Sequence, residues 1–112
     1  MARIYHLVPR ADWEAASGKP EYSAPSLASE GFIHCSKDHE QLFAVARRLY
    51  RDRTDMLALE LDTEALASPI KEEPSRSGES YPHIYGQINK TAVVRVLALA
   101  TDGAGEYSLA EI

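Results

Sequence analysis

The sequence predicts an α+β fold in which short strands outnumber short helices. Three observations lead to this prediction. Residues 3–8 form a strand-like run, and leucines recur at every second position over 56–62, which is typical of a strand. Residues 38–50 instead carry apolar side chains at helical spacing. Proline, glycine and serine separate these runs, so the predicted elements are short.

The composition is that of one ordinary globular domain over residues 1–112, with 45% hydrophobic and 26% charged residues. We see no internal repeat and no linker. The net charge of −5 argues against a general nucleic-acid binder, because affinity for the phosphate backbone comes from many Lys and Arg side chains. A small phosphorylated ligand stays compatible with this charge.

The single cysteine, Cys35, fits a reducing compartment, since it has no partner for an internal disulfide. No stretch approaches the ~20 apolar residues of a membrane span, and the first residues do not form a signal peptide. We therefore expect a cytoplasmic protein without a membrane partner.

The first half of the chain is predicted as strand, helix, turn and strand. A strand over 3–8 ends at Pro9, and a short helix over 11–16 places Trp13 on its inner face. Residues 21–24 are too short to assign. Pro25 begins one helical turn that Gly31 closes, and a second strand covers 32–35.

The clearest helix follows Asp38, which forms a capping-box pattern with Gln41. Its apolar positions are Leu42, Phe43, Val45, Ala46, Leu49 and Tyr50. The arginines at its end (Arg47, Arg48, Arg51 and Arg53) complement the helix dipole, an interpretation that we prefer to a phosphate site.

The second half is predicted to complete the sheet. A strand over 56–62 is followed by a capped turn over 62–66, a short strand over 70–73 and a flexible loop over 74–80. Strands over 83–88 and 92–100 come next, and the nearly continuous apolar run of the latter predicts burial on both faces. A short strand over 107–109 ends the fold.

Histidines in three strand-like runs are the candidate catalytic residues. His6 shares a face with Ile4 and Val8, and this apolar setting keeps its ring neutral; alternatively, it is a buried histidine bound to a backbone carbonyl. Strand alternation places His34 and Ser36 on one face, about 7 Å apart, where both could contact one ligand. Ser36 could instead cap the following helix, a role that Asp38 could also fill.

The same alternation turns Ile33 and Cys35 inward, so Cys35 is predicted to be a small buried hydrophobe and not a nucleophile. Beyond the candidate catalytic histidine His83, Tyr81 and Tyr85 share its face, and together they could form a wall for a planar ligand that Gly86 lets approach closely. The alternative is a pair of half-buried tyrosines at a sheet edge.

Two further candidates are weaker. Three histidines and a water could bind zinc, but no short-range ligand spacing such as HxxxH is present, so we predict no metal. Glu72 and Glu73 could supply an acid or base over the pocket, although a solvated charge pair is the favoured interpretation.

The chain resembles the domain of unknown function 952 family of uncharacterised bacterial proteins. The resemblance rests on residues 4–7, 31–36 and 81–86, together with Trp13, Tyr22, Gln41 and Ala46. The fold of that family is similar to that of ADP-ribosyltransferases, which implies a split, mainly antiparallel mixed sheet with a few short helices around a nucleotide cleft.

In those transferases a tyrosine–histidine or an arginine on the first strand contacts the adenosine ribose of NAD. Here His6 matches that position, and Ser36 with Phe32 match the second-strand position. The late segment 83–88 lacks the glutamate that those transferases carry on a late strand. RNA 2′-phosphotransferases of the same fold use arginines and histidines instead. The resemblance thus implies NAD as the candidate cofactor.

Three functions remain open. The first is a cleft that binds NAD, ADP-ribose or another phosphate-bearing ligand, with transferase-type chemistry carried by His6, His34, Ser36 and His83. Its ligand-binding residues would be Tyr5, Phe32, Tyr81, Tyr85 and Gly86. The second is a non-catalytic binding module that keeps the fold without the glutamate, and the third is a zinc hydrolase.

Overall fold

The computed structural model describes residues 2–102 and 104–112. In chain order its elements are β1 (Arg3–Pro9), α1 (Arg10–Ala15), β2 (Glu21–Tyr22), α2 (Pro25–Glu30), β3 (Ile33–His34), α3 (His39–Leu49), β4 (Met56–Asp62), β5 (Ile70–Pro74), β6 (Ser80–Ile84), β7 (Ile88–Asn89), the 3₁₀ turn η1 (Lys90–Ala92), β8 (Val93–Thr101) and β9 (Tyr107–Glu111). Within these ranges, no helix has the length and apolar character needed to span a bilayer.

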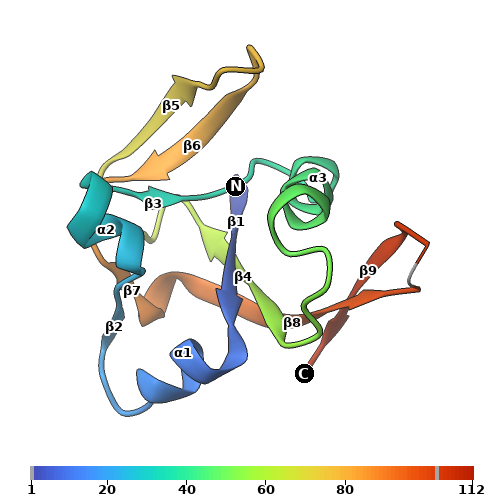
Figure 1. The fold of residues 1–112 in the computed structure, drawn as a ribbon. Helices are drawn as coiled ribbons and strands as arrows, with labels where there is room; N and C mark the ends of the chain where they lie inside the picture. Colours follow the sequence, from blue (N-terminus) through green and yellow to red (C-terminus); the bar gives the residue numbers. More distant parts are fainter. Residues whose placement is uncertain (1, 103) are drawn as a thin grey trace.

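The strands form three antiparallel sheets, so the protein is α+β as predicted (Figure 1). The largest sheet has the order β1-β4-β8-β9. A three-stranded sheet, β3-β6-β5, and the two-stranded pair β2-β7 lie apart from it. The strand predicted over 107–109 is found as the edge strand β9.

The large sheet is covered on both faces at β4, and this explains the apolar residues of that strand. Leu57, Leu59 and Leu61 on β4 point into the main core, where they pack with residues of β1, β3, β6 and β7. Met56 and Ala58 point to the opposite face, which α3 covers through Leu42 and Ala46. β4 is therefore the strand that is buried on both faces.

The segment after α2 links the small sheet to the large one. His34 pairs with His83 in the three-stranded sheet. Two residues later, Ser36 exchanges backbone hydrogen bonds with Tyr5, at N–O distances of 2.8 and 2.7 Å, on the edge of β1 that β4 leaves open. Ile33 and Cys35 are buried in the main core, which confirms the alternation predicted for this segment.

Asp38 caps α3, and the competing role for Ser36 is excluded. The Asp38 carboxylate accepts a 2.8 Å hydrogen bond from the Gln41 amide N–H. The reciprocal bond of a standard capping box is shifted by one residue, since Gln41 Oε1 accepts from the N–H of Lys37. Elsewhere, Gly31 ends α2 with a φ of 90°, a left-handed conformation that glycine adopts without strain. Trp13 packs on the main core.

Two predictions from the second half were wrong. The strand predicted over 83–88 ends at Ile84, because the chain turns at Gly86 before the separate strand β7. β8 is not buried on both faces: α3 covers only its second half at Leu97 and Leu99, and Val94 stays 41% exposed. Residues 74–80 close a hydrogen-bonded hairpin turn, in which the N–H of Ser75 donates to the carbonyl of Glu79.

Candidate functional site

A cavity of about 780 Å³ lies along the open edge of β1. Its walls come from α2, α3 and the β5–β6 hairpin, which meet around the segment that links β3 to α3. The lining residues used below are Tyr5, His6, His34, Ser36, Arg48, Glu73, Arg76, Tyr81 and His83. Val45 and Leu49, two of the apolar positions of α3, line the cavity as well.

All four candidate catalytic residues line this one cavity. His6 comes from β1, His34 and Ser36 from the linking segment, and His83 from β6. Two of the candidate ligand-binding residues, Tyr5 and Tyr81, line it too. The other three do not: the ring of Phe32 contacts His34 and His83, the ring of Tyr85 contacts that of Phe32, and Gly86 packs against Ser68.

His6 is held in one tautomer by the strand beside it. Its Nδ1 lies 2.7 Å from the backbone oxygen of His34, and because a carbonyl only accepts, Nδ1 carries the proton. The residue is 7% exposed, and burial lowers its pKa from 6.5 to about 4. The ring is therefore neutral at pH 7, with an unprotonated Nε2.

The Nε2 of His6 has no hydrogen-bond partner among the described residues. Both interpretations of this histidine thus hold at once. Nδ1 makes the structural bond to a backbone carbonyl, and Nε2 remains a hydrogen-bond acceptor on a residue that lines the cavity.

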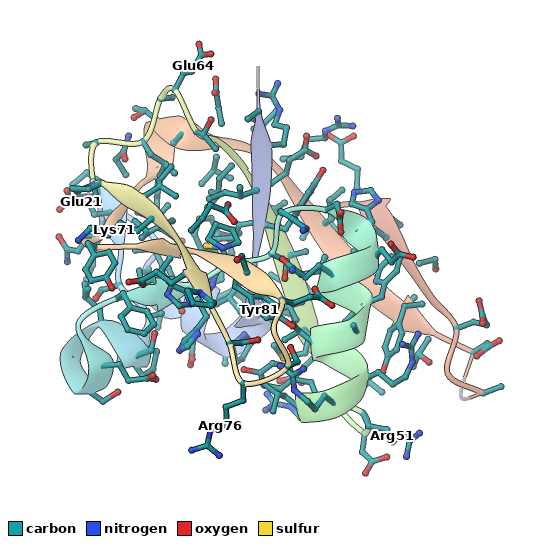
Figure 2. The ribbon with its side chains drawn as sticks, turned by 90° about the horizontal axis from the view of Figure 1, so that it is seen from above. Glu21, Arg51, Glu64, Lys71, Arg76 and Tyr81 are labelled. Carbon is teal, nitrogen blue, oxygen red and sulfur yellow. The ribbon has the colours of Figure 1, made fainter. Side chains whose placement is uncertain are left out.

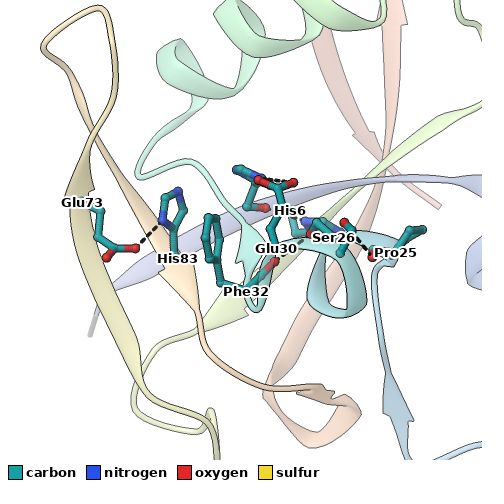
Figure 3. A network of polar contacts seen from close by, with 9 residues as sticks. His6, Pro25, Ser26, Glu30, Phe32, Glu73 and His83 are labelled. Carbon is teal, nitrogen blue, oxygen red and sulfur yellow. Dashed lines mark hydrogen bonds and ion pairs between the residues drawn. The ribbon is translucent and has the colours of Figure 1, made fainter.

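His83 is paired with a carboxylate across the hairpin (Figure 3). Its Nδ1 lies 2.6 Å from Glu73 Oε1, and the Tyr85 hydroxyl donates to the same oxygen at 2.6 Å. These hydrogen bonds, from Tyr85 first and His83 second, lower the pKa of Glu73 and keep it ionised. The bond to the carboxylate in turn raises the pKa of Tyr85.

Glu73 is the site residue that the sequence ranked too low: it was a candidate acid or base, but a solvated pair with Glu72 was the favoured interpretation. The signal that could have found it is the hairpin register. Glu73 pairs with Tyr81 and Lys71 with His83, so alternation puts residues 71, 73, 81 and 83 on one face and Glu72 on the other.

Phe32 packs the histidines together. Its ring stacks on His83 at a centroid distance of 4.1 Å, and it meets His34 edge-on at 5.0 Å. The His34 and His83 rings are 5.1 Å apart. His34 is the more accessible of the two, with a side chain 53% exposed, and its Nε2 contacts Glu30 at 3.1 Å.

Ser36 and Cys35 are less able to react with a ligand, because both residues are buried. Ser36 is 3% exposed, and its backbone makes the bridge to Tyr5. Cys35 is 4% exposed, and burial raises the pKa of its thiol, so the thiolate is strongly disfavoured. In the described part of the chain, no three or more His, Cys, Asp or Glu side chains are grouped to hold a metal ion.

Two arginines contribute to the cavity wall, Arg48 from the last turn of α3 and Arg76 from the hairpin turn. Figure 2 shows Arg76 extending outward from the tip of the hairpin. Neither guanidinium forms an ion pair with the carboxylates that the structure describes. Glu30 and Glu73, by contrast, are each engaged by a histidine.

The model of a protein family described as protein of unknown function (DUF952) matches residues 7–96. The chain belongs to the DUF952 family. A comparison of this DUF952 domain with curated proteins gave no match.

Among solved structures, the domain is similar to the protein CC0527 from Caulobacter crescentus, a structural genomics target. Its crystal structure shares 30% identity with a TM-score of 0.82, over 95% of this chain and 93% of that one. Its solution NMR structure shares 32% identity with a TM-score of 0.75, over 92% and 90% of the two chains. The likeness thus covers nearly the whole of both proteins.

Proposed function

We propose that this DUF952 domain binds a small nucleotide-type ligand, such as NAD or ADP-ribose, in the histidine-lined cavity. The observation that carries this proposal is the unpartnered Nε2 of His6. His6 is only 7% exposed, and its fixed acceptor can receive a hydrogen bond from a ligand hydroxyl or N–H, such as a ribose hydroxyl.

Three further properties of the cavity support a ligand of this class. Its volume of about 780 Å³ falls within the range of about 300–1,000 Å³ typical of small-molecule sites. Tyr81 and His83 offer aromatic surface to a base or sugar. Arg48 and Arg76 offer positive charge to a phosphate group.

The resemblance to ADP-ribosyltransferases that the sequence implies makes NAD and ADP-ribose the first ligands to test. Transferase chemistry on NAD is the catalytic form of this proposal, with His6, His34, Ser36 and His83 around the ligand. A binding module without chemistry is its non-catalytic form. Both require the same binding step, which can be measured alone.

The test is a titration with NAD, ADP-ribose and AMP, followed by the ring ¹⁵N signals of the histidines and by Trp13 fluorescence. We expect the ring signals of His6, His34 and His83 to shift. His6→Gln should weaken binding by about tenfold, since it removes one hydrogen bond. His39→Gln is the matched control, because this exposed histidine lies outside the cavity wall.

Absence of any change in the three ring signals up to millimolar ligand would overturn the proposal. So would equal losses in His6→Gln and His39→Gln. Thermal unfolding of each variant separates a lost contact with the ligand from a general loss of structure.

A further inference from the structure

We propose that Glu73 and His83 form a general-base pair that hydrolyses a phosphate diester held in the cavity. The inference rests on the proposed function, because it assigns a chemistry to the same cavity. It differs from ligand binding alone in requiring turnover, which is measured separately.

The geometry of the pair leaves one nitrogen of His83 facing a bound molecule. Glu73 Oε1 accepts the proton of His83 Nδ1 at 2.6 Å, so Nε2 is the nitrogen that exchanges protons with a bound molecule. Nε2 has no partner among the described residues, and His83 lines the cavity. A base oriented by a carboxylate is the arrangement that general-base catalysis requires.

The pair is held rigidly in place. Two donors, the His83 ring and the Tyr85 hydroxyl, fix the position of Glu73 Oε1. Phe32 stacks on the His83 ring, as Figure 3 shows, and limits its rotation. The interplanar angle of the two rings is 19°. The His83 side chain is only 12% exposed, so few water molecules compete for Nε2.

The charged groups around the pair favour a phosphate ester as the substrate. Arg48 and Arg76 line the same cavity without carboxylate partners in the described chain, and guanidinium groups bind phosphate oxygens well. Glu73 stays ionised and stabilises a positive charge that forms on His83. A phosphate ester is therefore the electrophile that suits this wall.

The proposed reaction consumes one water molecule. Nε2 of His83 takes a proton from the water as its oxygen bonds to phosphorus. The bond between phosphorus and one ester oxygen breaks, and its electron pair leaves with that oxygen. The departing oxygen then takes the proton from His83, so the products are a phosphate monoester and an alcohol, and the base is restored.

The experiment uses the full chain with bis(4-nitrophenyl) phosphate and with 2′,3′-cyclic AMP as probes. We expect the wild-type protein to release 4-nitrophenol or AMP, and His83→Gln to lower kcat by about 100-fold. Glu73→Gln should lower kcat by about tenfold with little change in KM, because it removes the charge but keeps an oxygen for Nδ1–H to bond. Glu73→Asp should recover part of the rate.

The matched control is Glu72→Gln, which makes the same charge change on the opposite face of β5. We expect it to match the wild type. Equal rates in Glu72→Gln and Glu73→Gln would overturn the proposal, as would hydrolysis by the wild type no faster than in buffer. If the nucleotides bind but neither probe is hydrolysed, only the general-base pair fails; if nothing binds, the proposed function fails first.

Discussion

The side-chain amide of Gln41 on α3 donates to Glu79 Oε1 in the β5–β6 hairpin, 2.8 Å away. The same nitrogen also contacts the carbonyl of Ser80 at 3.1 Å, while the amide oxygen accepts from the N–H of Lys37. Gln41 is buried, so one side chain ties the hairpin to the start of α3. The hairpin carries Glu73 and His83, so the hydrogen bonds of Gln41 also fix the positions of these two residues relative to α3.

Gln41→Leu should destabilise the protein by about 1–3 kcal/mol, because it leaves the N–H of Lys37 and the carbonyl of Ser80 without their partner. Urea unfolding measures this loss. Hydrogen exchange should accelerate at the amides of the hairpin turn. Gln87→Leu, a change at an exposed glutamine, is the control; if it costs as much as Gln41→Leu, Gln41 does not hold the hairpin.

His6 should make the protein less stable in mild acid. Its pKa is about 4 in the folded state against 6.5 ordinarily, so between these values the unfolded chain takes up a proton that the folded one does not. Its contribution is complete above pH 6.5 and is lost as the pH falls toward 4, up to about 3 kcal/mol in all.

Urea unfolding of the wild type and His6→Gln from pH 4 to 7 checks this prediction. The difference between the two curves cancels the other titrating groups to first order. We expect the wild type to lose its advantage as the pH falls. Parallel curves would mean that His6 does not titrate on unfolding.

Gly86→Ala should be destabilising by about 1–3 kcal/mol, because the new methyl group would overlap Ser68. A Cβ at position 86 would lie 2.7 Å from the Cβ of Ser68 and closer still to its hydroxyl. Ser68→Gly in the same chain should recover part of the loss. Thermal denaturation of both single variants and the double variant gives the coupling, and strict additivity would exclude the contact as the cause.

Cys35 should resist thiol reagents in the folded protein. The thiol is 4% exposed and its raised pKa disfavours the thiolate, so we expect labelling by Ellman's reagent at least about two orders of magnitude slower than for a free thiol. In denaturant the rate should rise to that of N-acetylcysteine. Fast labelling of the folded protein would contradict the burial.

Local patterns in the sequence predicted much of the fold. Alternation was enough to turn Cys35 inward and His34 outward, because each side chain's direction depends on its immediate neighbours. The cap at Asp38 and the glycine at the end of α2 were likewise readable, since these signals act within a few residues. The burial of β8 could not be predicted in this way, because it depends on how far α3 extends across the sheet.

The cavity was predictable only in part. Hydrophobic context indicated a neutral His6, but its bond to the carbonyl of His34 joins residues 28 positions apart. The pairing of Glu73 with His83 depends on the register of the hairpin, which a glutamate in a polar run does not reveal. Contacts that depend on register and on packing between elements therefore needed the structure.

The segment from Phe32 to Ser36 joins two sheets, pairing with His83 at one position and with Tyr5 two positions later. Because both of its ends are paired with other strands, the length of the segment is fixed. An insertion or deletion of one residue here would exchange the two faces, turning an imidazole toward the main core and the Cys35 thiol away from it. This stretch lies between two helices, as many surface loops do. Its sequence can change during evolution by substitution, but its length cannot change.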